Sequence, residues 1–215
     1  MTTAGQWAWP IVLSVVLLPS SLSADVFVRD DIITDPDPAA FSICYNHTCK
    51  EVVTLSLDGR QWREVQAVFT PPATGGVQER RKVAEAVALF EEMVGGLVGT
   101  NHDKGGNLQG LLSGGKQLDC IDESTNTTTF LAMLEKGRLL RWHTVEDRSS
   151  RGFFIFGMPH TTAVVKDNAT GEKWAVDSWF HDNGVPPEIL PLGEWRGGWE
   201  PPVTSPHISP VGPQD

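Results

Sequence analysis

Apolar and polar residues alternate along several short stretches, and this pattern predicts β-strands. The first stretch is residues 51–57 (EVVTLSL), and three further β-prone runs follow at 139–145, 153–165 and 173–180. The polar stretch between the last two runs, KDNATGE at 166–172, is typical of a hairpin turn. We therefore expect the second half of the chain to contain an antiparallel sheet.

Two other segments have the residue spacing of helices. In residues 78–93 the apolar side chains recur on one face, and the charged residues from Glu79 to Lys82 are expected on the opposite face. Residues 119–138 form the second predicted helix, with acidic residues in the first turn, where they complement the helix dipole. The chain should thus combine helices with the predicted sheet.

The start of the chain is set apart by its lack of charge. Residues 1–24 carry no charged side chain, and an apolar stretch runs from Trp7 to Leu18 before the small residues that end at Ala24. This stretch is shorter than the ~20 residues that a membrane-spanning helix needs. It predicts an export signal that is cleaved near Ala24. An uncleaved anchor and a buried native helix are the alternatives.

Composition divides the remaining residues into three parts. Residues 25–77 form an N-terminal segment that opens with an acidic leader rich in turn residues. Residues 78–199 hold most of the predicted helices and strands and form the main domain, which includes a glycine-rich loop at 95–115. Residues 200–215 are rich in proline and are expected to be extended or disordered.

Length and charge narrow the range of functions. The 215 residues suffice for one domain, since single cores usually contain ~100–200 residues. The net charge of −10 argues against a surface that binds nucleic-acid phosphates or anionic lipid. Residues 110–116 have the G-x-x-x-x-G-K spacing of a phosphate-binding loop, but Gln117 stands where Ser or Thr should bind magnesium. We expect neither nucleic acid nor a nucleotide as a partner.

Three cysteines suggest two different roles. Cys44 and Cys49 are close enough in the chain to form a disulfide in an oxidising compartment, which fits the predicted export signal. Two unpaired thiols, or a metal pair with His47, are the alternatives, although no second Cys/His pair with zinc spacing is present. Cys120 is left over, and an unpaired thiol in an exported protein needs an explanation.

Cys120, His160 and Asp177 form a pattern that is typical of thiol catalysis. Cys120 lies at the start of a predicted helix, where the dipole and the free amides should lower its pKa and could hold an oxyanion. His160 begins one strand, and a hairpin centred near Ala169 would set Asp177 opposite it. A register slip of one residue would instead turn the two side chains to opposite faces.

The same residues resemble the core of the transglutaminase-like superfamily. LDCIDES at 118–124 is similar to the G-D-C-E-D-x-A motif of the bacterial transglutaminase-like cysteine peptidases, and FLAMLEKGRLLRW at 130–142 resembles their helix leading into a strand. PHTTAVV at 159–165 and WAVDSWF at 174–180 resemble their His and Asp strands.

This resemblance implies an α+β, papain-related fold in which residues 78–199 are the catalytic domain, with the cysteine helix packed against an antiparallel sheet. It also implies that Cys120 is the nucleophile, His160 the general base and acid, and Asp177 the acid that orients the imidazole. The expected substrate is a protein or peptide amide, cleaved or transferred without a cofactor, and the expected location is periplasmic or secreted.

Two other functions remain open on the sequence. The first is a non-enzymatic, exported binding module that keeps the fold with an inert Cys120, since a lone cysteine is most often a small buried apolar residue. The second is a cell-wall peptide hydrolase of the NlpC type, which usually orients its histidine with a second His or an Asn.

The sequence also allows predictions for several residues outside Cys120, His160 and Asp177. Trp179 faces the same side as Asp177 and is expected in the core or at the wall of a cleft. The Ser, Thr and Asn residues of 124–129 are poor helix formers and are expected to hydrogen-bond within a packed site. His143 is expected at the surface, and residues 101–104 as a polar turn.

Overall fold

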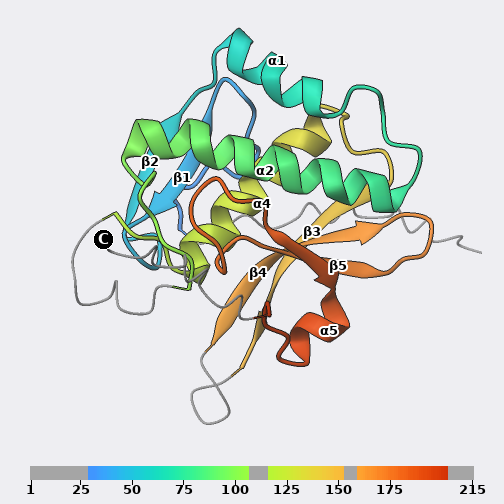
Figure 1. Ribbon diagram of the computed structural model, residues 1–215. Helices are drawn as coiled ribbons and strands as arrows, with labels where there is room; N and C mark the ends of the chain where they lie inside the picture. The colour runs from blue at the N-terminus through green and yellow to red at the C-terminus, as the bar shows by residue number, and fades with distance from the viewer. Residues whose placement is uncertain (1–28, 107–115, 153–158, 203–215) are drawn as a thin grey trace, which may run out of the picture.

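The computed structural model describes residues 29–106, 116–152 and 159–202 and has an α+β architecture (Figure 1). No helix in these ranges combines the length and the apolar character needed to cross a membrane. In chain order the elements are β1 (Phe41–Tyr45), β2 (Glu51–Leu55), α1 (Gly59–Val68), α2 (Gly76–Val98), α4 (Cys120–Lys136), β3 (His143–Arg151), β4 (His160–Asp167), β5 (Lys173–Asp177), β6 (Glu188–Pro191) and α5 (Leu192–Arg196).

Four antiparallel strands form the main sheet, in the order β3-β4-β5-β6. The predicted hairpin joins β4 and β5, with Ala163 paired to Val176. Because side chains alternate between the two faces of a sheet, these two residues belong to the main core with α4, whereas Val164 and Ala175 pack against α5. The sheet is therefore covered on both faces, and the β4-β5 hairpin contributes buried side chains to the packing on each face.

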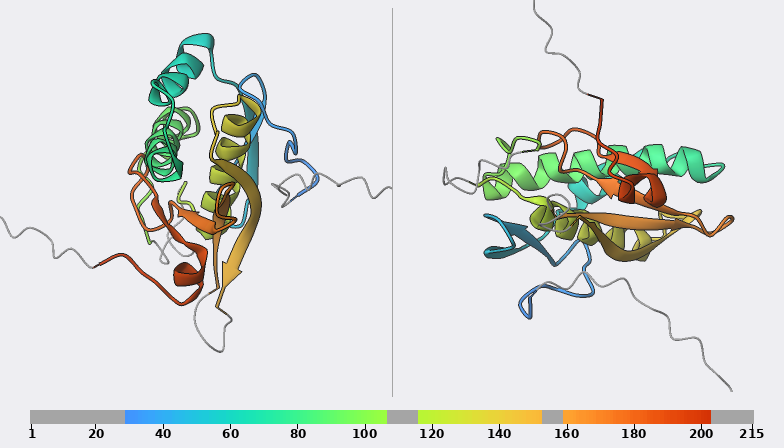
Figure 2. Two further views of the ribbon diagram at one scale, coloured as in Figure 1. Left: turned by 90° about the vertical axis from the view of Figure 1, so that its right-hand side faces the viewer. Right: turned by 90° about the horizontal axis from the view of Figure 1, so that it is seen from below.

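Helix α4 is the centre of the fold. It lies between α2 and the strand pair β1-β2, and it also contacts β3 and β4 (Figure 2). Phe130 of α4 stacks on Phe90 of α2, with ring centroids 4.7 Å apart. Both predicted helices are confirmed, and α2 continues to Val98, so the first glycines of the predicted loop at 95–115 are helical.

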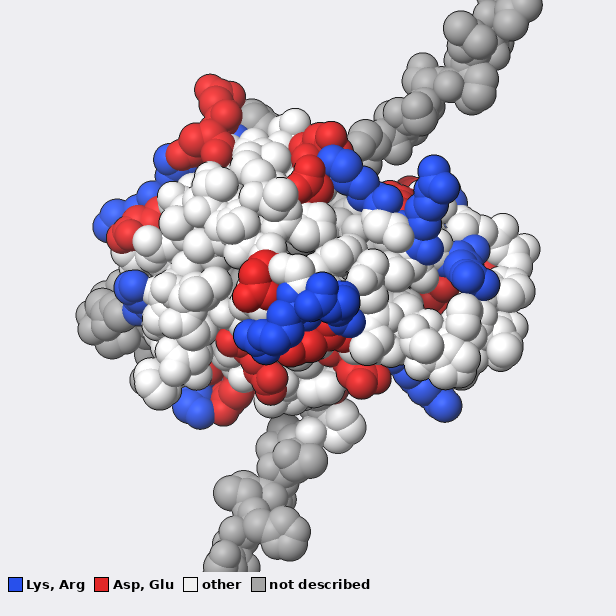
Figure 3. All heavy atoms as spheres, turned by 90° about the horizontal axis from the view of Figure 1, so that it is seen from above, with Lys and Arg blue, Asp and Glu red and all other residues white. Residues whose placement is uncertain are grey.

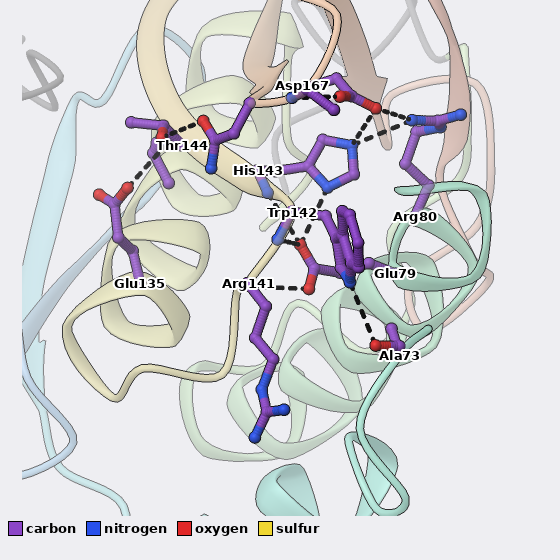
Figure 4. Close-up of polar contacts among 12 residues, drawn as sticks. Ala73, Glu79, Arg80, Glu135, Arg141, Trp142, His143, Thr144 and Asp167 are labelled. Atoms are coloured by element: carbon purple, nitrogen blue, oxygen red, sulfur yellow. Dashed lines mark hydrogen bonds and ion pairs between the residues drawn. The ribbon is translucent and has the colours of Figure 1, made fainter. Parts of the chain in front are cut away.

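A buried polar cluster corrects two expectations. Glu79 is buried rather than on the solvent face of α2, and its carboxylate accepts the backbone N–H groups of Arg141, Trp142 and His143 at 2.7–3.0 Å (Figure 4). His143, expected at the surface, is buried too, and its Nδ1 lies 2.9 Å from Glu79 Oε1. Since these amides bond to a carboxylate, the strand that was predicted from residue 139 begins only at His143.

The cluster continues to the other side of His143. Arg80 Nη1 lies 3.0 Å from His143 Nε2 and 3.4 Å from Asp167 Oδ2 (Figure 4). The guanidinium of Arg80 also lies over the ring of Trp174. These contacts join the start of α2 to the end of the β3-β4 pair where His143 is opposite Asp167, next to the turn between β4 and β5. His160 lies at the opposite end of that pair, next to Arg151 of β3.

The N-terminal segment shares the main core. Phe41 and Ile43 of β1 and Val65 of α1 are buried in the same cluster as residues of α2 and α4. Helix α1 begins with a capping box in which Asp58 and Gln61 bond to each other's backbone N–H groups. The structure therefore shows no boundary between two separate cores at residue 78.

Several expectations fall on residues that the structure does not describe. They concern the export signal, most of the proline-rich tail, the greater part of the phosphate-loop spacing and residues 153–158 of one predicted strand.

On the face seen from above, the described basic side chains lie interspersed with acidic ones (Figure 3).

Candidate active site

Cys120 is the first residue of helix α4, and its sequence neighbours fix where that helix begins. Asp119 is the N-cap, and its Oδ1 accepts the N–H groups of Ile121 and Asp122 at 3.0 and 2.9 Å. Asp122 Oδ2 in turn accepts the N–H of Asp119 at 3.2 Å, which completes a capping box. The thiol is thus held at the helix N-terminus by local contacts.

The disulfide loop also holds this end of α4. The predicted bond between Cys44 and Cys49 is present, so these cysteines are not a metal pair. Residues 46–49 all have φ between 51° and 70°, a left-handed run that is unfavourable for residues other than glycine. Such a run turns successive N–H groups toward a common acceptor, as in the anion-binding turns called nests.

The acceptors for this loop are the two capping carboxylates. The N–H groups of His47 and Cys49 donate to the two oxygens of Asp122 at 2.8 and 2.6 Å, and that of Thr48 donates to Asp119 Oδ2 at 2.8 Å. The loop therefore binds both residues that define the start of the cysteine helix.

These contacts correct one expectation about the helix amides. The amides of Ile121 and Asp122 were expected to be free to hold an oxyanion, but both already donate to Asp119. An oxyanion near the sulfur therefore needs other donors.

The hairpin brings His160 and Asp177 into contact, but not directly opposite each other as predicted, because the pairing of Ala163 with Val176 sets Asp177 opposite Thr162. His160 Nε2 lies 2.7 Å from Asp177 Oδ2, and both side chains are more than 90% buried. Since a carboxylate accepts a hydrogen bond, the neutral imidazole is assigned the tautomer that carries its hydrogen on Nε2 and donates it to Asp177. Both residues lie on the sheet face that α5 covers, which follows from their alternation with Val164 and Ala175.

Aromatic side chains enclose this imidazole. The ring centroids of Trp179, Phe180 and Trp195 lie 4.8, 5.3 and 5.4 Å from that of His160. Trp179 is half-buried beside the imidazole, as expected for a residue at the wall of the site. Trp195 is fully buried, and its role was not visible in the sequence because it comes from the separate helix α5.

The sulfur of Cys120 reaches the backbone on both sides of His160. Sγ lies 3.9 Å from the carbonyl oxygen of Pro159, and a backbone hydrogen bond from Thr161 lowers the pKa of the thiol. Burial outweighs this effect and, together with the charges of Asp119 and Asp177, raises the pKa of Cys120 to about 11. The prediction that the pKa of Cys120 is lowered is therefore wrong, because burial and nearby carboxylates raise this pKa more than the helix N-terminus lowers it.

The second imidazole nitrogen is the most informative atom of the site. His160 Nδ1 is buried and has no hydrogen-bond partner among the described residues, so no hydrogen bond joins it to the Cys120 sulfur in this structure. A buried acceptor without a donor costs about 1–3 kcal/mol. The structure thus keeps an unpaired nitrogen on the residue that lies between the two backbone contacts of the thiol, Pro159 and Thr161.

A set of buried carboxyl groups, which the sequence did not predict, lies near the site. Glu123 is one turn along α4 from Cys120, and burial together with the charge of Glu91 raises its pKa well above the usual range. Burial also raises the pKa of Glu91 to about 8 and that of Asp103 to about 6. Asp103 lies in the predicted turn at 101–104 and accepts the N–H of Leu118 at 2.7 Å.

The polar residues of α4 do hydrogen-bond inside the packed site. Asn126 accepts the N–H of Cys44 at 2.7 Å and donates to its carbonyl oxygen at 2.8 Å, so the side chain joins α4 to β1. The hydroxyl oxygen of Thr127 lies 2.8 Å from that of Ser178, the residue that directly follows Asp177. These bonds connect the cysteine helix to the disulfide strand and to the end of β5.

No family model, no curated protein and no solved structure matches the chain. Within the described ranges, no group of three or more His, Cys, Asp or Glu side chains is arranged to hold a metal ion. A function has to be inferred from the geometry of the site itself.

Proposed function

We propose that the chain is a thiol enzyme that acts on amide bonds, as a cysteine peptidase, amidase or acyl transferase, with Cys120 as nucleophile. Two observations carry this proposal: the bond from His160 Nε2 to Asp177 leaves Nδ1 without a partner among the described residues, and the Cys120 sulfur contacts the backbone of the residues on both sides of His160. An imidazole with one nitrogen fixed by a carboxylate and the other free to accept a proton is the arrangement that general-base catalysis requires.

The reaction follows from these roles. The Cys120 sulfur attacks the carbonyl carbon, and His160 Nδ1 accepts the thiol proton as the carbon–sulfur bond forms. The amine leaves with that proton, and a thioester remains. Water or a second amine then attacks the thioester, His160 accepts its proton, and the thiol is restored by proton return. Because the pKa of Cys120 is raised to about 11, the resting nucleophile is a thiol that reacts only as its proton moves.

We further propose that the fold is a transglutaminase-like core. The support is a central helix that begins at Cys120 and packs on an antiparallel sheet, whose β4-β5 hairpin carries His160 and Asp177. The acid that orients the imidazole is Asp177, whereas the NlpC type usually uses His or Asn for this role. The Cys44–Cys49 disulfide favours an oxidising compartment, and thus a periplasmic or secreted protein.

The test uses p-nitrophenyl acetate as an acyl probe. Of the three cysteines in the chain, two are bonded to each other, so Cys120 is the one free thiol. We expect one equivalent of p-nitrophenolate to be released in a burst, an acetyl group on Cys120, and steady turnover afterwards. Cys120→Ala should abolish the burst and the turnover while the chain stays folded. An unchanged burst in that variant would falsify the proposal.

One observation favours the second candidate, a binding module with an inert thiol. The raised pKa of Cys120 makes the thiol less reactive than a free cysteine unless a base assists it. Alkylation by iodoacetamide at neutral pH separates the two functions. With His160 as base, His160→Ala should slow alkylation by about 100-fold. An inert thiol reacts slowly in both proteins.

A further inference from the structure

Trp195 connects helix α5 to the acid of the proposed triad. Its side chain is fully buried, and the indole Nε1–H donates to Asp177 Oδ2 at 2.6 Å. The same oxygen lies 2.7 Å from His160 Nε2. One carboxylate oxygen therefore bridges an imidazole and an indole.

The indole is itself held from strand β3. The guanidinium carbon of Arg151 lies 4.5 Å from the centre of the Trp195 ring, a cation–π arrangement. Arg151 Nη1 also donates to the backbone carbonyls of Trp195 and Trp199. A shift of Trp195 relative to Asp177 would have to break these contacts, so the donor is fixed in place.

The third donor completes the orientation of the carboxylate. Asp177 Oδ1 accepts the N–H of Trp179 at 3.3 Å, while Oδ2 is shared by His160 and Trp195. Hydrogen bonds to an ionised carboxylate are stronger than neutral ones, and donors on both oxygens fix its plane. A fixed plane keeps the imidazole hydrogen on Nε2 and leaves Nδ1 as an acceptor, which has no hydrogen-bond partner in the described part of the chain.

We propose that Trp195 is a positioning residue of the site: its indole N–H holds the Asp177 carboxylate, and through it His160, in the orientation that leaves Nδ1 free to accept the thiol proton. This inference rests on the proposed function. It assigns to α5, which supplies none of Cys120, His160 and Asp177, a part in positioning the base.

Trp195→Phe tests the proposal, because phenylalanine keeps an aromatic ring but has no N–H. Trp142→Phe is the matched control: the Trp142 indole N–H donates to the Ala73 carbonyl at 3.1 Å, in the polar cluster at the far end of the β3-β4 pair (Figure 4). Both substitutions remove one indole hydrogen bond and should lower the melting temperature. Only the first touches Asp177.

The first measurement is the tautomer of His160, read from its imidazole nitrogen-15 shifts. Wild type and Trp142→Phe should show hydrogen on Nε2, whereas Trp195→Phe should show a mixture of both tautomers. This reading does not depend on whether Cys120 reacts. An unchanged tautomer in a folded Trp195→Phe overturns the inference and leaves the proposed function intact.

The second measurement is turnover of p-nitrophenyl acetate. We expect kcat of Trp195→Phe to fall about 10-fold or more with little change in KM, because the lost interaction orients a base rather than binds the probe. In an Asp177→Asn background the same substitution should change kcat by less than about twofold, since the carboxylate that the indole orients has been replaced. Equal effects in both backgrounds overturn the inference, whereas absence of any acetyl-Cys120 in wild type overturns the proposed function.

If Trp195→Phe does not fold, the indole proton of Trp195 carries the test. In wild type its resonance should lie at low field and exchange slowly, and Asp177→Asn should move it upfield. A resonance that does not respond to Asp177→Asn shows that the indole does not hold the carboxylate.

Discussion

Asp177 lies diagonally across the β4-β5 hairpin from His160, on the same face of the sheet. The pairing of Ala163 with Val176, continued by one residue, sets Thr162 directly opposite Asp177. The 2.7 Å contact with His160 is therefore made along the diagonal, which long side chains can span.

This relationship predicts the effect of Asp177→Asn. An amide can donate as well as accept, so it no longer requires hydrogen on Nε2, and part of the population presents the wrong tautomer to the thiol. We expect a folded protein whose kcat with p-nitrophenyl acetate is at least about 100-fold lower, given the about 10⁴-fold loss when the acid of a serine-protease triad is changed to Asn. Circular dichroism checks the fold, and steady-state turnover checks the effect. Wild-type turnover would mean that Asp177 does not orient the base.

The disulfide loop provides a second prediction. Replacing both Cys44 and Cys49 by Ala should lower the free energy of unfolding by about 2 kcal/mol, the loop-closure value for a short loop. The left-handed turn should then relax, and its amides should release Asp119 and Asp122 at the start of α4. Acylation of Cys120 should therefore slow as well, as measured by the burst rate. A normal burst rate in the less stable variant would show that the loop serves stability alone.

The buried carboxyl groups predict how stability depends on pH. Burial raises the pKa of Glu91 to about 8 and of Asp103 to about 6, whereas both ionise near their usual values in the unfolded chain. Between those values the folded state holds protons that the unfolded state has lost. Stability should thus be complete below about pH 4 for these groups and fall as the pH rises through 6 and 8.

The measurement is urea unfolding at pH 5, 6.5 and 8, compared between wild type and Glu91→Gln. The variant removes one titrating proton, so its stability should fall less steeply, by up to about 1.4 kcal/mol per pH unit. Parallel pH profiles for the two proteins would contradict the assignment of this proton to Glu91.

Glu79 is the subject of the fourth prediction. Glu79→Ala removes the acceptor of three backbone N–H groups and of His143 Nδ1, all near or within the core. Loss of one partner from a buried ionic cluster costs about 3–5 kcal/mol, and we expect a loss of that size in urea unfolding. Glu85→Ala, on the exposed side of the same helix, is the control and should change little. The folded fraction of Glu79→Ala should acylate normally, because the cluster is remote from Cys120.

Local signals in the sequence were sufficient to locate the elements that carry Cys120, His160 and Asp177. The acidic first turn located the start of α4, and the polar stretch at 166–172 located the hairpin that unites His160 and Asp177. The capping box of Asp58 and Gln61 was an available signal for α1 that the apolar pattern alone did not reveal.

Contacts between distant segments could not be predicted in this way. Glu79 occupies a polar position in the helical pattern, and only the approach of residues 141–143 makes it buried. The prediction of a lowered thiol pKa was wrong for the same reason. The helix N-terminus is a local feature, whereas the burial of Cys120 depends on tertiary packing. Trp195 reaches Asp177 because β6 and α5 fold back onto β5, and no sequence motif predicts this arrangement.

The two hydrogen bonds between Asn126 and the backbone of Cys44 have a consequence for how the protein can mature. Asn126-Thr127-Thr128 is an acceptor triplet for N-linked glycans, which are attached to a nascent chain in the eukaryotic secretory route. A sugar on this amide nitrogen would separate α4 from β1 and block folding. Production should therefore succeed in a bacterial host, or in a eukaryotic one once the oligosaccharide is prevented from reaching this position.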